Sequence, residues 1–132
     1  MLFIYLIKHF VFLMKVLLVD DDSVHLFILE KIFEKSNAKV VVAQNGKEAL
    51  QYLEVDPEFN IILTDLMMPI MDGVEFLEHL KGSDATKGIP AIGFTAGDVE
   101  YYREKSKGQF HFLVAKPMDF YDLYNLAKST AA

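Results

Sequence analysis

Cysteine is absent from this chain of 132 residues, and basic residues are fewer than acidic ones. Without cysteine there is no disulfide framework, no thiolate nucleophile and no cysteine zinc site, which fits a reducing compartment, so we expect the cytoplasm. The 13 Lys and Arg against 19 Asp and Glu give a formal net charge of −6. Because this charge repels the nucleic-acid backbone and no Lys/Arg cluster offsets it, we expect no direct binding to nucleic acid.

Linkers and repeats are lacking as well. The sequence contains no Gly/Ser-rich linker, internal repeat or low-complexity tract that would mark a second domain. With 52% hydrophobic residues, a chain of this length buries a core without disulfides or a structural metal. We therefore expect one domain over residues 15–132, preceded by an apolar N-terminal extension of residues 1–14.

The extension, MLFIYLIKHFVFLM, is apolar apart from Lys8 and His9. A transmembrane helix needs about 20 apolar residues, and a signal peptide needs a basic start and a small-residue cleavage site. Neither pattern is present, so membrane attachment is disfavoured. Because MKVLLVDDD from Met14 would itself make a natural start, one interpretation is an upstream segment outside the domain. The alternative is an element that packs on the domain or on a partner, such as the second copy in a homodimer.

Short β-branched apolar runs alternate with segments of helical spacing from Lys15 onward. The pattern predicts strands over residues 15–20, 39–43, 61–64, 90–95 and 110–115. It predicts helices over residues 23–36, 46–54, 73–81, 98–108 and 119–129. Ser23 is the candidate N-cap of the first helix. Strands that are apolar on both faces and separated by helices indicate an α/β fold with a parallel sheet covered on both sides.

The number of units narrows the fold further. Five strand–helix units are too few for an eight-stranded barrel and suit a flavodoxin-like doubly wound sheet of five parallel strands, whose usual order is 2-1-3-4-5. In such sheets, ligands bind outside the carboxyl ends of the strands where the order reverses, here between the first and third strands.

Charged or hydroxyl side chains follow four of the five predicted strands. They are Asp20, Asp21 and Asp22 after the first strand, Asp65 after the third, Thr95 at the end of the fourth and Lys116 after the fifth. Each has a structural interpretation when taken alone, such as helix capping or a solvated charge. Their joint placement at one edge of the sheet favours a functional site.

Several carboxylates within a few ångströms of each other cannot all stay ionised without a positive partner, because like charges raise each other's pKa. A hard divalent cation such as Mg²⁺ suits an oxygen-rich site of this kind. With the metal and Lys116 to hold phosphoryl oxygens, Thr95 to hydrogen-bond one of them and Asp65 as a nucleophile, the residues favour an aspartyl-phosphate site.

The stretches VLLVDDD, ILTDLMMPIMDG, GFTAG and VAKPM, in this order, resemble the receiver domain of two-component response regulators over about residues 15–129. The resemblance implies that Asp65 accepts a phosphoryl group from a histidine kinase or phosphotransfer protein. It also implies that Thr95 reports the phosphoryl group, that Lys116 pairs with it, and that Pro117 follows a cis peptide bond.

The same resemblance implies a metal site. Asp21 and Asp65 would bind Mg²⁺ directly together with the backbone carbonyl of Met67, and Asp20 would act through water. Asp22 would then be a helix-entry residue, although the sequence alone leaves open a register in which Asp21 and Asp22 are the metal acids.

The sequence departs from the family pattern at the positions that carry the signal. Leu113 stands where the family usually has an aromatic residue, and strand alternation turns the neighbouring Phe112 to the opposite face. The fourth helix also looks short, because Gly108 ends it. Met67 and Gly97 occupy the two positions that tune loss of the phosphate in the family. Since neither side chain can orient a water molecule, we expect slow self-dephosphorylation.

The leading hypothesis is a stand-alone receiver that catalyses only its own phosphorylation and dephosphorylation and signals to an unknown downstream protein or passes the phosphoryl group onward. A Mg²⁺-dependent phosphohydrolase with an Asp nucleophile is disfavoured because position 67 is Met, which breaks the D-x-D arrangement. A phosphate-independent interaction module is disfavoured because the complete set of site residues is present. His9, His25, His79 and His111 show no metal-binding spacing, and no glycine-rich phosphate loop is found.

Overall fold

The computed structural model describes residues 1–3 and 13–132. Most of the N-terminal extension lies outside the described residues, so both interpretations of its role stay predictions. None of the helices formed by the described residues has the length and apolar character needed to cross a bilayer.

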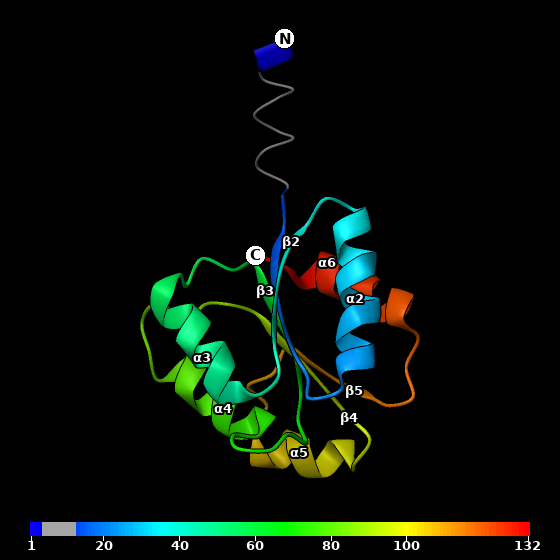
Figure 1. Ribbon diagram of the computed structural model, residues 1–132. Helices are drawn as coiled ribbons and strands as arrows, with labels where there is room; N and C mark the ends of the chain where they lie inside the picture. Colours follow the sequence, from blue (N-terminus) through cyan, green and yellow to red (C-terminus); the bar gives the residue numbers. More distant parts are fainter. Residues whose placement is uncertain (4–12) are drawn as a thin grey trace.

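Five parallel strands form one sheet (Figure 1). Their bounds are β1 Lys15–Val19, β2 Lys39–Ala43, β3 Ile61–Asp65, β4 Ala91–Thr95 and β5 Phe112–Ala115. The order is β2-β1-β3-β4-β5, as predicted. The central strands β3 and β4 are buried along their whole length, because helices cover both faces of the sheet.

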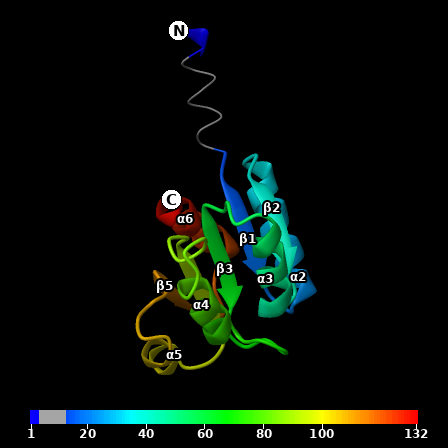
Figure 2. The ribbon, with the colours of Figure 1, turned by 90° about the vertical axis from the view of Figure 1, so that its left-hand side faces the viewer.

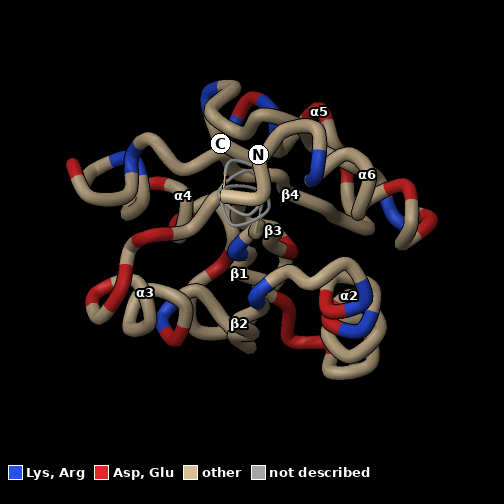
Figure 3. Tube along the Cα trace, turned by 90° about the horizontal axis from the view of Figure 1, so that it is seen from above, with Lys and Arg blue, Asp and Glu red and all other residues tan. Residues whose placement is uncertain are grey.

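Five helices follow the strands along the chain. Their bounds are α2 Ser23–Lys35, α3 Gly46–Val55, α4 Gly73–Lys81, α5 Val99–Lys105 and α6 Phe120–Thr130. Seen along the sheet in Figure 3, α3 and α4 lie on one side of the strands and α2 and α6 lie on the other. The arrangement is the predicted doubly wound α/β fold.

Each face of the sheet has its own hydrophobic core, and β1 contributes to both through strand alternation. Leu17 and Val19 face α3 and α4, where they pack with Phe76 and Leu77. Val16 and Leu18 belong to the cluster on the opposite face, under α2 and α6. Burying one such side chain contributes about 1.5–3 kcal/mol, so the two cores hold the strand ends in place.

The start of the first helix differs from the prediction. Asp22 is the N-cap, and its Oδ1 accepts hydrogen bonds from the backbone N–H groups of Val24 (3.0 Å) and His25 (3.2 Å), whereas Ser23 is the first helical residue. A carboxylate caps the helix well because it accepts two N–H groups and lies at the positive end of the helix dipole. Asp22 thus lies at the helix entry, as the resemblance implied.

The fourth helix is shorter than predicted. α5 ends at Lys105, and the chain then turns through Lys107 and Gly108, which have φ values of 55° and 66°. Glycine adopts this left-handed conformation without the steric penalty that other residues meet. The turn replaces the last helical residues that the sequence pattern suggested.

Different parts of the chain meet at the two ends of the sheet. The start of β1 and the C-terminus lie together at one end (Figures 1 and 2), where Asn60 Oδ1 accepts a hydrogen bond from the Lys15 N–H at 2.7 Å. At the other end, the loops after β1, β3, β4 and β5 bring together the polar residues that follow the strands.

Candidate functional site

Asp20, Asp21 and Asp65 converge at the carboxyl ends of β1 and β3. These strands are neighbours in register, with Val19 opposite Thr64, so the residues that follow them meet at the sheet edge. One carboxylate oxygen from each of the three acids lies within 4.8 Å of those from the other two. Asp20 and Asp65 are buried and Asp21 is exposed. The acidic cluster therefore contains Asp20 and Asp21, whereas Asp22 is the N-cap of α2 and lies outside the cluster.

Asp20 is a fully buried acid with an unsatisfied oxygen. Its Oδ1 accepts a hydrogen bond from the Asp22 N–H (3.0 Å), but its Oδ2 accepts no hydrogen bond from the residues that the structure describes. Burial, together with the nearby charge of Asp65, raises the pKa of Asp20 to about 6, although the hydrogen bond from Asp22 and the charge of Lys116 oppose the shift. A cation bound beside Asp20 Oδ2 would remove the cost of leaving this oxygen unpaired.

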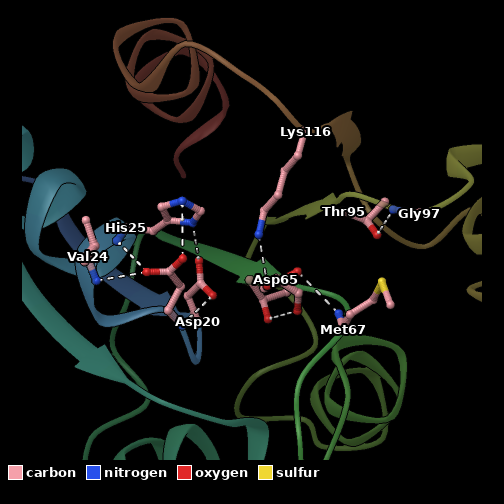
Figure 4. A network of polar contacts seen from close by, with 10 residues as sticks. Asp20, Val24, His25, Asp65, Met67, Thr95, Gly97 and Lys116 are labelled. Atoms are coloured by element: carbon pink, nitrogen blue, oxygen red, sulfur yellow. Dashed lines mark hydrogen bonds and ion pairs between the residues drawn. The ribbon is translucent and has the colours of Figure 1, made fainter.

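Asp65 is held from two sides (Figure 4). Lys116 Nζ lies 3.1 Å from its Oδ2, and the backbone N–H of Met67 donates to its Oδ1 over 3.3 Å. Lys116 is placed by the backbone, because its N–H donates to the carbonyl of Thr95 (2.8 Å) at the end of β4. The peptide bond between Lys116 and Pro117 is cis, as the resemblance implied.

Gly73 explains how the loop after β3 closes over the site. A Cβ at this position would lie 2.5 Å from the carbonyl oxygen of Asp65 and 2.8 Å from the Cα of Leu66. The first residue of α4 therefore approaches the Asp65 backbone closely only because it is glycine. The Gly73 N–H donates to the Leu66 carbonyl at 3.0 Å and fixes this approach.

Thr95 is fully buried at the end of β4, the strand next to β3. Its Oγ1 accepts a hydrogen bond from the Gly97 N–H at 2.9 Å (Figure 4). The hydroxyl proton remains available for a second hydrogen bond. A phosphoryl oxygen is an acceptor of the kind that this proton would bind.

Leu113 takes the position on β5 at which an aromatic residue was expected. It packs against the α3/α4 face of the sheet, where a Cβ on Gly93 would lie 2.9 Å from its Cδ2. Val114 packs against the other face, and Phe112 is 47% exposed. Phe112 therefore does not occupy the place of Leu113, as strand alternation predicted.

His25, which the sequence pattern did not assign to the site, lies at the edge of the acidic cluster (Figure 4). Its Nδ1 lies 3.5 Å from Asp20 Oδ2, and its Nε2 lies 3.4 Å from Asp22 Oδ2. The ring also packs edge-on against Phe120, with 5.5 Å between the ring centroids. The three-residue spacing between Asp22 and His25 could have indicated this contact, because a residue three positions after an N-cap lies over the cap on the first helical turn.

The acids fit a magnesium ion. Three converging carboxylates and one buried oxygen without a partner form an oxygen-rich donor set, and hard cations such as Mg²⁺ prefer oxygen ligands. Met67 lies next to these acids, and its backbone N–H already contacts Asp65. The ligand role of its carbonyl stays a prediction.

Comparison with known proteins identifies the family. The sequence model of the response regulator receiver domain matches residues 16–128. The two-component response regulator ORR11 of Oryza sativa subsp. indica is 34% identical over 114 residues, which cover 83% of this chain and 78% of that protein. The chain therefore belongs to the response regulator receiver domain family.

Solved structures agree on the fold. A CheY-like response regulator receiver domain protein from Methanospirillum hungatei JF-1 has a TM-score of 0.80 and 28% identity, covering 89% of this chain and 92% of that one. The receiver domain of the sensor histidine kinase PA1611 from Pseudomonas aeruginosa PAO1, solved with a magnesium ion coordinated in its active-site cleft, has a TM-score of 0.78 and 22% identity. The matched region covers 89% of this chain and 96% of the PA1611 receiver domain. At this identity, the similarity shows the fold alone.

Proposed function

We propose that Asp65 accepts a phosphoryl group from a histidine kinase or phosphotransfer protein in a Mg²⁺-dependent reaction. The observation that carries this proposal is the environment of the Asp65 carboxylate. One side faces the ammonium of Lys116 at 3.1 Å, and the other faces the acids Asp20 and Asp21. A nucleophilic oxygen is thus placed between a fixed cation and a cluster suited to a second one, which is the arrangement that phosphoryl transfer needs.

In the transfer step, an Asp65 carboxylate oxygen attacks phosphorus in line with the leaving group. A bond forms between that oxygen and phosphorus, and the bond between phosphorus and the donor's histidine nitrogen breaks. Lys116 stabilises the phosphoryl oxygens as they become more negative. When bound, magnesium would be held by Asp21 and Asp65, with Asp20 acting through water, and would neutralise further negative charge.

Thr95 would carry the signal away from Asp65. Its hydroxyl can donate to a phosphoryl oxygen, and movement toward that oxygen would stretch the 2.9 Å hydrogen bond that Oγ1 accepts from Gly97. The loop between β4 and α5 would then shift, which biases the surface formed by α5, β5 and α6 between two states. A downstream protein that binds this surface would read the phosphorylation state.

The chain would catalyse only its own phosphorylation and dephosphorylation, and phosphodonors would be its only substrates. We place this exchange in the cytoplasm, because a chain without cysteine fits a reducing compartment. The magnesium described for the PA1611 receiver domain is consistent with the metal assignment. A phosphate-independent interaction module would not need the buried and unsatisfied Asp20, whose retention is costly without a cation.

The test is the intact mass of the chain after incubation with Mg²⁺ and acetyl phosphate. The unmodified chain should gain one phosphate, and Asp65→Asn should gain none. Asp84→Asn is the matched control, because the Asp84 side chain is 96% exposed and lies outside the acidic cluster. Equal mass gain in Asp65→Asn and the unmodified chain, or no gain in either with a donor shown to be active, would contradict the proposal.

A further inference from the structure

The space beside Gly97 is filled by a side chain from α5. A Cβ at Gly97 would lie 3.1 Å from Cε2 of Tyr102, 3.3 Å from Oγ1 of Thr95 and 3.6 Å from Sδ of Met67. One point next to the phosphorylation site is thus bordered by a tyrosine ring edge, a threonine hydroxyl and a methionine sulfur. Figure 4 shows Met67 and Gly97 on the Thr95 side of Asp65.

The ring of Tyr102 is fixed by its neighbours. Asp98 caps α5 directly after Gly97 and accepts hydrogen bonds from the N–H groups of Glu100 (2.9 Å) and Tyr101 (3.3 Å). The Tyr102 side chain is half-buried and packs against the core under α3 and α4. The Tyr102 ring also makes an edge-to-face contact with Tyr101, with ring centroids 5.1 Å apart.

We propose that Tyr102 supplies from α5 the side chain that Gly97 lacks, and that its ring, together with Met67, keeps water away from the phosphorylated Asp65. The inference rests on the proposed function and deepens it, because it assigns a residue that sets the lifetime of the phosphoryl group. Tyr102 is a positioning residue in this role. It does not touch the reacting atoms but limits which molecules reach them.

Loss of the phosphate requires a water molecule at phosphorus. The water oxygen forms a bond to phosphorus, the bond from phosphorus to the Asp65 carboxylate oxygen breaks, and a water proton passes to solvent. The ring edge of Tyr102 and the thioether of Met67 offer this water no strong hydrogen-bond acceptor. Water on this side of the site is therefore neither oriented nor activated.

The test compares the first-order loss of phosphate, followed by intact mass, after excess donor has been removed in the presence of Mg²⁺. Tyr102→Ala should lose phosphate at least about threefold faster than the unmodified chain, because the space beside Gly97 opens to water. Tyr102→Phe keeps the ring edge and should stay within about twofold. Glu104→Ala is the matched control on the same helix, because Glu104 is exposed on α5, and it should also stay within about twofold.

The initial rate of mass gain separates a purely structural role: if Tyr102→Ala slowed phosphorylation as much as it sped the decay, the effect would come from loosening α5 and the role of Tyr102 would be overturned. Tyr102→Leu keeps an apolar side chain and serves in place of Tyr102→Ala if that variant does not fold. If the unmodified chain is phosphorylated and all Tyr102 variants decay at its rate, the role of Tyr102 is overturned and the proposed function stands. If no chain gains phosphate, the proposed function and this inference both fail.

Discussion

The ammonium of Lys116 lies 3.1 Å from Oδ2 of Asp65, and both side chains are largely buried, with exposed fractions of 18% and 7%. Taking both charges out of water is costly, so loss of one partner would leave the other charge buried and uncompensated. The pair also leaves the ammonium beside the atom that would bear the phosphoryl group. The same contact would therefore serve both the resting protein and the proposed transfer step.

Replacing Lys116 with Met should slow phosphorylation of Asp65 by about 10- to 100-fold, because a fixed cation is removed from the transferring oxygens. The initial rate of mass gain with acetyl phosphate and Mg²⁺ measures the effect. Lys31→Met is the control, since the Lys31 side chain on α2 is 58% exposed. Equal rates in the two variants would show that Lys116 has no part in the transfer.

Magnesium should stabilise the protein against heat through Asp21 and not through Asp22. A metal present at 100 times its Kd adds about 2.7 kcal/mol to the free energy of unfolding, so Mg²⁺ should raise the Tm of the unmodified chain. Asp21→Asn should abolish this rise. Asp22→Asn keeps a side-chain oxygen that caps α2, because Asn and Asp are equally good N-caps, so this variant should keep the rise with metal. The reverse pattern would assign the metal to the register of Asp21 and Asp22.

The stability of the metal-free protein should depend on pH through Asp20. Its pKa is raised from 3.8 to about 6 by burial, so between these values the folded protein holds a proton that the unfolded chain has released. The slope of the free energy of unfolding with pH is negative in this window, and stability from this group is lost as the pH rises through about 6.

Asp20→Asn removes this titration. The free energy of unfolding of the variant, relative to the unmodified chain, should therefore rise by on the order of 1–3 kcal/mol between pH 4.5 and 7.5. Urea unfolding with a chelator present measures the difference. A difference that is constant with pH would mean that Asp20 is ionised in the folded protein throughout this range.

Much of the fold could be predicted from local patterns. The strands β1 to β5 and the order of the sheet follow from apolar runs separated by helical periodicity, because a parallel sheet covered on both faces needs both signals. The strand order in turn predicts that Asp20, Asp65 and Lys116 lie close together, because the carboxyl ends of parallel strands share one edge of the sheet. These features depend on topology rather than on details of packing.

The features that the sequence did not predict depend on contacts between elements. Ser23 and Asp22 are both good N-caps, and only the backbone conformation decided between them in favour of Asp22. The contact of Tyr102 with Gly97 joins a helix to the loop before it, and no periodicity encodes where that ring points. His25 likewise reaches the acids only because α2 starts at the end of β1.

The double variant Met67→Asn and Gly97→Glu should lose phosphate faster than the unmodified chain, by at least about tenfold, because a positioned carboxylate and amide can orient and activate the attacking water. The side chain that Gly97→Glu introduces must push the Tyr102 ring aside slightly, since a Cβ at position 97 would lie 3.1 Å from its Cε2. Gly97→Ala separates the two effects, because it displaces the ring without adding an acceptor. Phosphate loss in each variant is followed by intact mass. Unchanged decay in the double variant would show that water activation at these positions does not limit the lifetime of the phosphoryl group.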